Sequence, residues 1–427
     1  MEEEKKKTRR KASDIDSNKE VEIREVIVEK KVGFNYAEVI VVMIITLIIG
    51  AMVGSFVSFF GKSTKTTNTI IKSSDIPTEM NEFLKVYNSI LDEYYKKVDK
   101  KELIEAGING MFEYLGDDYS VYMDKETTKS FNEQVDGKYK GIGVEIVTVE
   151  DVTTISRVFT GSPAAEAGLK VGDIFLKVDN EDVSKKNDSE LAKVIKESGK
   201  DKVTVVIKRD EEEKEFTLNL REVNIDTITT EVFEKNGKKV GYIYVSIFSS
   251  TTDTQFAKAL KELESKGIDS LIIDVRSNSG GYLTCVTSMV SLFMNKSKII
   301  YQLDTKGVVE QIYSISNESR NYPIAVIVNK ASASASEILA AALQESYGAK
   351  VIGTNSFGKG TVQRAYQLES GATIKYTVQK WLTPKGNWIN GVGVTPDVEV
   401  ELSEEYFENP SNETDNQLQK AIEEVSK

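Results

Sequence analysis

The chain has 427 residues, 40% of them apolar and 29% charged, which is enough for two or three domains with buried cores. Its net charge of -12 argues against nucleic-acid binding, because nucleic acids require concentrated basic surface. The sequence contains no histidine, which excludes a Ser-His-Asp triad, and a single cysteine, which excludes an internal disulfide. We expect Cys285 to be a small buried residue and expect no metal site, because only carboxylates remain as further ligands.

The N-terminal part of the sequence predicts a membrane anchor. Residues 1–35 are charged with mixed signs, which is typical of a disordered cytoplasmic tail. Within residues 36–61, Val39 to Phe60 is 22 residues without a charge. A helix of that length spans about 33 Å, enough to cross a hydrocarbon core of about 30 Å. Because basic residues cluster in the tail, we expect a single-pass protein of the cell membrane with an extracytoplasmic remainder; the alternative is a buried helix of a soluble core.

A linker and a helical region follow the predicted anchor. Residues 62–76 are rich in Ser, Thr and Lys and predict the linker. In residues 77–138, apolar side chains such as Phe83 and Val86 recur at helical spacing. We therefore expect two helices joined near Val98.

Residues 139–222 change to short apolar runs and predict a compact β-rich module. Strands are expected at 143–148, 153–158, 174–178, 202–208 and 215–220, with one helix at 189–197. The module opens with the turn Gly141-Ile142-Gly143-Val144, which leads into the first strand. Consecutive N–H groups in such a turn can hold a carboxylate; the alternative interpretation is a plain hairpin turn.

A second landmark of the module begins with Gly161-Ser162-Pro163 and ends with the turn Val171-Gly172-Asp173. The two landmarks, in this order, resemble a PDZ domain of the bacterial protease type. The resemblance implies that the module binds C-terminal peptide ends by adding a strand beside the carboxylate loop. Proteases of this kind often carry an Arg near the end of the module's last helix. This chain has Lys196 there, so the resemblance leaves a charge-mediated coupling to the protease domain open.

Residues 223–402 alternate between strand and helix patterns, which predicts an α/β core with a mixed, largely parallel sheet. Strands are expected at 240–245, 271–275, 299–303, 324–328 and 350–352, and helices at 256–263 and 283–294. Residues 403–427 end in a charged helix, expected at an edge or in a dimer contact. The predicted fold is therefore an α/β core with an inserted β-rich module, an N-terminal helical segment and one transmembrane helix.

Three serines lie between a predicted strand and a predicted helix. Ser332, Ser334 and Ser336 follow the apolar run 324–328, and helical spacing begins at Glu337. N–H groups at a helix start can stabilise an oxyanion, so any of the three is a candidate nucleophile. The spacing of Ser334 and Glu337 also fits a helix-capping box, which is the structural alternative.

With no imidazole available, a serine nucleophile needs another base, and Lys359 is the leading candidate. A free lysine has a pKa of about 10.4 and is protonated at neutral pH, but burial favours the neutral amine. The sequence Phe357-Gly358-Lys359-Gly360 suits a tight, dry turn, and the alternative is a surface lysine in a glycine turn. Gln363 offers an uncharged amide that could orient the amine without restoring its charge.

The stretch from Asp274 to Gly281 is a third candidate element, a buried strand that ends in a polar turn with paired glycines. The N–H of Gly281 could join that of Ala335 as an oxyanion donor. The alternative is a loop that needs unusual backbone angles.

Four ordered motifs resemble the carboxyl-terminal processing proteases, PDZ-bearing serine peptidases of the tail-specific S41 type. They are D-x-R-x-N-x-G-G, S-A-S-A-S-E-I, F-G-K-G-x-x-Q and the run Thr383 to Asp397, and the similarity covers about residues 80–400. The resemblance implies that Ser334 is the nucleophile, Lys359 the general base and Gln363 its support.

The residues and the resemblance together predict a membrane-anchored Ser-Lys endopeptidase. Its substrates would be proteins or peptides with accessible C-termini, cleaved through an acyl-enzyme without a metal or organic cofactor and without nucleic acid. The resemblance also implies a homodimer formed through segments 77–122 and 401–427. The alternatives are a noncatalytic PDZ scaffold and a membrane assembly factor that interacts through its charged tail.

Overall fold

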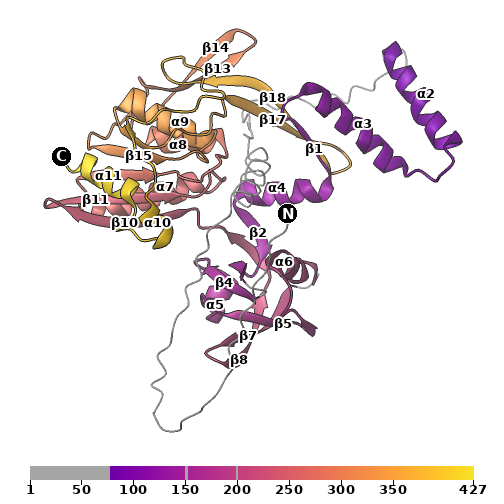
Figure 1. Cartoon of the computed structure of the whole chain (residues 1–427), viewed down its shortest axis with the longest axis horizontal. Helices are drawn as coiled ribbons and strands as arrows, with labels where there is room; N and C mark the ends of the chain where they lie inside the picture. Colours follow the sequence, from indigo (N-terminus) through magenta and orange to yellow (C-terminus); the bar gives the residue numbers. More distant parts are fainter. Residues whose placement is uncertain (1–76, 150–151, 199–200) are drawn as a thin grey trace, which may run out of the picture.

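The computed structural model describes residues 77–149, 152–198 and 201–427 (Figure 1). The predicted tail, the predicted membrane span from Val39 to Phe60 and the predicted linker lie outside these residues. Among the described helices, none combines the length and apolar character needed to cross a bilayer.

Two amphipathic helices, α2 (Thr78–Glu93) and α3 (Lys100–Leu115), extend away from the rest of the molecule (Figure 1). Helix α3 is capped by Asp99, whose carboxylate accepts hydrogen bonds from the N–H groups of Lys101 and Glu102 at 2.8 and 3.0 Å. In the described part of the chain, neither helix has a buried residue. Their apolar side chains are therefore left largely exposed.

A short connecting region follows and consists of β1 (Val121–Met123), α4 (Lys125–Asp136) and β2 (Lys138–Gly141). Strand β2 pairs antiparallel with β9 (Arg221–Asn224). This two-stranded ribbon lies where the chain enters and leaves the β-rich module, so α4 stands between the module and the core (Figure 1).

The β-rich module is a five-stranded antiparallel sheet with a short additional strand and two helices. Its five longer strands and helix α6 lie where the sequence predicts them, with boundaries that differ by up to three residues, whereas the short β6 was not predicted. The elements are β3 (Val144–Val149), β4 (Val152–Val158), α5 (Pro163–Ala167), β5 (Ile174–Val178), β6 (Glu181–Asp182), α6 (Asp188–Glu197), β7 (Lys202–Arg209) and β8 (Glu212–Asn219).

The core contains a six-stranded sheet in the order β10-β11-β12-β15-β16-β19. All its neighbouring strands are parallel except β10 and β11, which confirms the largely parallel sheet predicted for this region. The strands are β10 (Ile228–Lys235), β11 (Lys238–Val245), β12 (Ser270–Asp274), β15 (Ile324–Val328), β16 (Lys350–Gly353) and β19 (Val398–Glu399).

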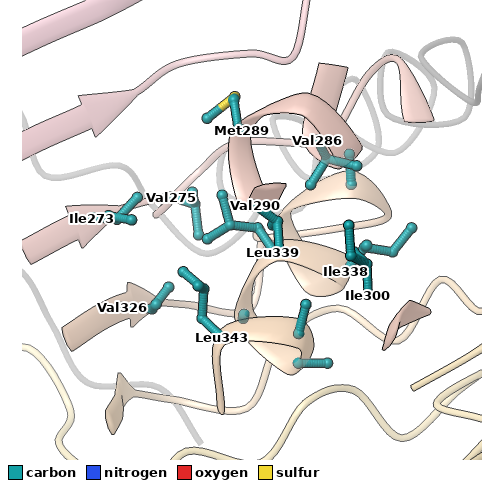
Figure 2. Close-up of a cluster of buried hydrophobic side chains, with 14 of the residues drawn as sticks. Ile273, Val275, Val286, Met289, Val290, Ile300, Val326, Ile338, Leu339 and Leu343 are labelled. Carbon is teal, nitrogen blue, oxygen red and sulfur yellow. The ribbon is translucent and has the colours of Figure 1, made fainter. Parts of the chain in front are cut away.

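One face of this sheet is covered by α7 (Thr252–Ser265), α8 (Leu283–Ser291) and α9 (Ala335–Ala342), which continues as the π-helix η2 (Leu343–Tyr347). Figure 2 shows Ile273 and Val326 of the strands facing Val290 and Leu339 of the helices. Helix α9 is buried along its whole length, so the serines at its start are fixed by the main core.

The C-terminal helix α11 (Asn416–Val425) covers the opposite face of the same sheet, after the short helix α10 (Glu404–Glu408). The helix therefore covers a face of the sheet and does not lie at its edge, whereas the expected dimer contact stays a prediction. Its apolar side chains recur at helical spacing and pack on the strands, which buries them within the chain. They are Leu418, Ala421, Ile422 and Val425.

A second, antiparallel sheet was not predicted. It contains β1, β13 (Ile299–Thr305), β14 (Val308–Tyr313), β17 (Thr361–Gln367) and β18 (Thr373–Leu382). The strand predicted at 299–303 exists, but it pairs with β14 and β18 instead of joining the parallel sheet. Lys359 directly precedes β17, so this sheet supports one side of the candidate active site.

Candidate active site

The hydrogen bonds of the three serines distinguish Ser334 from the other two. The Ser332 hydroxyl donates to the Val275 carbonyl and the Ser336 hydroxyl to the Asn278 carbonyl, both at 2.8 Å. Both side chains are completely buried. These two serines thus tie the strand-to-helix junction to the loop after β12, whereas Ser334 stands at the N-cap of α9 with a backbone φ of +55°.

The carboxylate of Glu337 joins the serine and lysine motifs. Its Oε2 accepts hydrogen bonds from the N–H groups of Ser334 and Lys359, at 2.8 and 2.9 Å. Its Oε1 accepts from the Gly358 N–H and the Ser356 hydroxyl, both at 2.6 Å. Burial raises the pKa of Glu337, whereas these four hydrogen bonds lower it by stabilising the charged form. The backbone N–H groups of Ser334 and Lys359 are therefore hydrogen-bonded to the same carboxylate oxygen.

Lys359 lies in a tight, buried turn, as the sequence predicts. Lys359 is only 1% exposed, and its Nζ lies 4.6 Å from the centroid of the Tyr119 ring. The Trp381 indole donates to the Lys359 carbonyl at 2.7 Å. Gly358 is required because its φ is +89° and an added Cβ would lie 2.9 Å from the Val392 nitrogen. Val392 belongs to the run Thr383 to Asp397, the fourth family motif. This run therefore packs directly against the turn that contains Lys359.

Burial lowers the pKa of Lys359 to about 8, although the negative charges of Glu337 and Asp117 oppose the shift. A substantial fraction of this amine is therefore neutral at slightly alkaline pH. A neutral amine can accept a proton from a hydroxyl group, which an ammonium cannot.

Gln363 is completely buried at the start of β17. Its Nε2 donates to the hydroxyls of Thr361 and Thr377 at 2.9 and 3.1 Å. These two bonds fix the orientation of the amide, and Oε1 has no hydrogen-bond partner among the residues described. The free acceptor is what a support for the lysine amine requires.

The glycine pair after β12 lies against the serine motif. A Cβ added at Gly280 would lie 2.8 Å from the Ser334 Cβ and 3.1 Å from the Ala335 nitrogen, so only glycine fits. The N–H of Gly280 donates to the Asn278 side chain and that of Tyr282 to the Phe248 carbonyl, at 2.8 and 2.7 Å. The intervening Gly281 N–H is not used in these bonds. The structure thus brings the two predicted oxyanion residues, Gly281 and Ala335, onto adjoining segments.

The charged residues of the same motif have a structural role. The Arg276 guanidinium bridges the buried carboxylates of Asp274 and Asp415, at 2.6 and 2.7 Å. Asp415 also caps α11 by accepting from the Leu418 N–H at 2.9 Å. This ion pair therefore fastens the C-terminal helix to the end of β12.

The predicted carboxylate loop of the module lies between β2 and β3. Ile142 is buried, and the carbonyls of Ile142 and Gly143 accept from the N–H groups of Ala164 and Phe159, at 2.9 and 3.0 Å. Within residues 77–149, 152–198 and 201–427, β3 is an edge strand that pairs only with β4, and α6 contacts it. Gly141 ends β2 and Val144 begins β3, so these two residues flank the loop. Because one edge of β3 is unpaired within this part of the chain, it can accept an added strand beside the loop.

Lys196 at the end of α6 forms an ion pair with Glu133 of α4. This ion pair joins the module to α4 in the N-terminal helical region and not to the protease core, so the coupling to the protease domain stays a prediction. Helix α4 also contacts the glycine loop, because the Tyr282 hydroxyl donates to Asp136 at 2.8 Å.

The sequence interpretation missed three residues of the site: Glu337 beyond its capping role, Asp117 and Tyr119. The short turn Asp117 to Ser120 is held by the Asp117 carboxylate, which accepts from the Tyr119 N–H and the Ser120 hydroxyl at 3.1 and 2.5 Å. Its cluster of turn formers is a signal of a tight turn. Nothing in the local sequence indicates that the Tyr119 ring would cover Lys359.

The fold and this site define a class, an α/β serine peptidase that carries a PDZ domain. The sequence model of the protein family described as "Peptidase family S41" matches residues 239–400 of this chain. The family model described as "PDZ domain" matches residues 154–209. A third model, "Activating protease CtpB N-terminal domain", matches residues 48–127.

Two relatives identify the family. The chain is 39% identical over 334 residues to the carboxy-terminal processing protease CtpB of Bacillus subtilis, covering 78% of this chain and 70% of that protein. It is 33% identical over 376 residues to a protein of Staphylococcus saprophyticus named "Probable CtpA-like serine protease", with coverages of 87% and 75%. The chain belongs to the S41 carboxy-terminal processing proteases. This membership favours an enzyme over the noncatalytic scaffold and the assembly factor.

A solved structure shares the fold. It is described as an S41 protease from Bacteroides fragilis, is 18% identical, and aligns with a TM-score of 0.52 over 78% of this chain and 91% of that chain. At this identity the likeness concerns the fold alone.

Proposed function

We propose that this chain is a membrane-anchored, extracytoplasmic endopeptidase in which Ser334 is the nucleophile and Lys359 the general base. Lys359 Nζ takes the proton of the Ser334 hydroxyl as the oxygen attacks a peptide carbonyl carbon, and the N–H groups of Gly281 and Ala335 stabilise the oxyanion. The ammonium then returns the proton to the leaving amine as the C–N bond breaks. Lys359 then takes a proton from water as the water oxygen attacks the acyl carbonyl, and the ammonium returns this proton to the Ser334 oxygen as the ester C–O bond breaks.

The observation that carries this proposal is the Glu337 carboxylate, which holds the backbones of Ser334 and Lys359 on one oxygen. Ser332 and Ser336 donate to backbone carbonyls instead. Burial of Lys359 supplies the second requirement, a neutral amine, and Gln363 Oε1, which has no partner among the residues that the structure describes, could serve as its acceptor.

The test is digestion of an unfolded protein such as casein by the wild type, Ser334→Ala and Lys359→Ala. Both variants should lose activity by at least about 1,000-fold. Gln363→Ala should lose less, because it removes an orienting group and not a reacting one. Unchanged proteolysis in either of the first two variants would defeat the Ser-Lys dyad.

The PDZ domain is proposed to capture substrate C-termini and to gate the active site. The one-sided β3 and the adjoining glycine loop support strand addition, and the Lys196–Glu133 ion pair supports coupling through α4. Deletion of residues 139–222 should alter cleavage of peptides with free C-termini. If cleavage is unaffected, PDZ gating does not occur.

Membrane anchoring is proposed from the uncharged run Val39 to Phe60 and the basic cluster that precedes it. The full chain should stay with membranes after alkaline carbonate extraction, and the catalytic domain should be digested by protease added outside intact cells. Release by carbonate, or protection from the external protease, contradicts this placement.

A further inference from the structure

The Tyr119 ring lies at the boundary between the Lys359 amine and solvent. Its centroid is 4.6 Å from Lys359 Nζ, so the amine lies over the ring. Lys359 is only 1% exposed, whereas Tyr119 is half-buried, with part of its surface in contact with water. No step of the proposed reaction uses this tyrosine. The ring is therefore a part of the pocket wall that separates the proposed base from solvent.

The turn that carries Tyr119 is held in place by its own hydrogen bonds and by two neighbouring elements. The Asp117 carboxylate accepts from the Tyr119 N–H and the Ser120 hydroxyl, at 3.1 and 2.5 Å. The Ser120 N–H donates to the Asp117 carbonyl at 2.9 Å and closes the turn. Beyond the turn, β1 pairs with β18, and the Tyr122 hydroxyl donates to Glu105 of α3 at 3.0 Å. The ring is thus anchored by α3 on one side and by β18 on the other.

One residue of β18 anchors both this turn and the amide that is proposed to support the base. The Thr377 N–H donates to the Ser120 hydroxyl oxygen at 3.1 Å. The Thr377 hydroxyl accepts from Gln363 Nε2, also at 3.1 Å. Tyr119 and Gln363 belong to segments far apart in the sequence, yet Thr377 fixes both. The ring and the amide therefore approach Lys359 in a fixed relation to each other.

The Tyr119 hydroxyl does not titrate together with Lys359. Burial is the main cause that raises the pKa of Tyr119 to about 12, and the carboxylates of Glu337, Asp118 and Asp117 contribute to the same shift. The phenol therefore stays neutral in the pH range in which Lys359 titrates, since burial lowers the pKa of Lys359 to about 8. What acts on the amine is the ring itself.

The ring has two opposing effects on the protonation of Lys359. By excluding water it removes the hydration of an ammonium ion and favours the neutral amine. Its π face attracts a cation and favours the ammonium, as do the facing carboxylates of Glu337 in α9 and Asp117 in the turn. Burial is the largest influence on Lys359, so water exclusion outweighs these attractions. Lys375, the titratable group that β18 contributes nearby, is unchanged in every variant below.

We propose that Tyr119 is a positioning residue for the Lys359 base: its ring closes the buried turn against water and so keeps the amine in the neutral form that accepts a proton. The inference rests on the proposed role of Lys359. In the reaction, Lys359 takes the Ser334 proton and returns it to the leaving amine, and Tyr119 exchanges no proton. The ring then faces the ammonium that exists between these two transfers.

The pH dependence of kcat/KM tests this role with the full chain and a peptide substrate. Tyr119→Ala lets water reach the amine, which favours the ammonium. The acid limb should therefore move to higher pH by about one unit, a loss of about tenfold on the acid side with the alkaline plateau retained. Tyr119→Phe keeps the ring and should restore the limb to its wild-type position. Tyr313→Ala, the same change at an exposed tyrosine of β14 at the far edge of the sheet, should leave the profile unchanged.

Three results for Tyr119→Ala overturn the proposal: an acid limb at the wild-type pH, a loss that is equal at every pH, and a limb that moves to lower pH. The second result is that of a purely structural role. The third would mean that the ring chiefly stabilises the ammonium. A limb that shifts equally in Tyr119→Phe also overturns the proposal, because the effect would then belong to the hydroxyl.

Lys359→Ala separates the role of Tyr119 from the proposed function. If that variant keeps its activity, the Ser-Lys mechanism itself fails. If it is inactive while Tyr119→Ala keeps the wild-type limb, only the role of Tyr119 fails.

If Tyr119→Ala does not fold, the cover is tested by NMR in Ser334→Ala, which retains the ring. Lysines labelled with carbon-13 at Cε are followed as the pH changes, and Lys359→Met in this background identifies the Lys359 signal. The Lys359 Cε protons should show a nuclear Overhauser effect to a labelled tyrosine ring, lost in Tyr119→Phe, and the amine should titrate below pH 9. No such contact, or a midpoint at the ordinary value of about 10.4, would overturn the proposal.

Discussion

Ser334 and Lys359 both occupy positions that oppose folding. The backbone of Ser334 has φ +55° and ψ −112°, a conformation that costs a non-glycine residue about 1–3 kcal/mol. Lys359 loses the hydration of its amine on burial. The fully satisfied Glu337 carboxylate holds both residues in place. Since the costs fall on the two residues proposed to react, activity explains them better than stability does.

The first prediction separates Ser334 from its neighbours. Ser334→Gly should lose at least about 1,000-fold in proteolysis yet gain about 1 kcal/mol in unfolding free energy, because glycine accepts a positive φ. Ser332→Ala should instead lose about 1–2 kcal/mol of stability, because it removes the bond to the Val275 carbonyl. Urea unfolding and casein digestion measure both quantities. A stable, inactive Ser332→Ala would point to the wrong nucleophile.

The second prediction concerns the linkage of Lys359 to stability. Its pKa is about 8 in the folded protein and about 10.4 in the unfolded chain, so between these values only the unfolded chain binds the proton. Stability therefore rises with pH across this window, and the full penalty, about 3 kcal/mol, applies below pH 8. Lys359→Met should be more stable than wild type by about that amount at pH 7 and by much less at pH 10. A difference that is constant between urea titrations at the two pH values contradicts this explanation.

At the scale of elements, the parallel sheet could be predicted because its central strands are continuous apolar runs. The antiparallel sheet could not. Strand β18 buries Lys375 and Thr373 on its inner face, and such side chains give no apolar alternation. The role of Glu337 was also hidden, because its capping-box spacing is local, whereas its bond to Lys359 joins segments far apart in the sequence. Both failures concern polar groups whose burial depends on tertiary contacts.

The third prediction concerns the attachment of α11 to the sheet. Arg276→Met should lower the unfolding free energy by about 3–5 kcal/mol, because it leaves the Asp274 and Asp415 carboxylates buried without a cation. The matched control is Lys330→Met, which removes one partner of the exposed pair with Glu401 and should cost less than about 1 kcal/mol. Chemical denaturation compares the two. Equal effects would show that the Arg276 contacts do not fasten the helix.

At the scale of the whole molecule, α4 is the element on which the parts converge. It contacts the PDZ domain through Glu133, the glycine loop through Asp136 and Lys375 of the antiparallel sheet through Phe131. The order of these parts along the chain could be predicted from the four motifs and the two PDZ landmarks. Their convergence on α4 could not be predicted, because a helix of mostly polar residues gives no sign of three separate contacts.

The last prediction concerns the exposed helices α2 and α3, which we propose pair two copies of the chain. Leu84 and Met111 are 42% and 53% exposed although both are apolar, whereas the apolar face of α11 is already buried within the chain. A stable interface needs about 800 Å² from each partner, which two amphipathic helices can supply. The double variant Leu84→Glu, Met111→Glu should halve the mass of the full chain measured by light scattering in detergent, whereas Lys85→Glu on the same helix should not. A wild-type monomer, or equal masses for both variants, would mean that these helices serve a different partner.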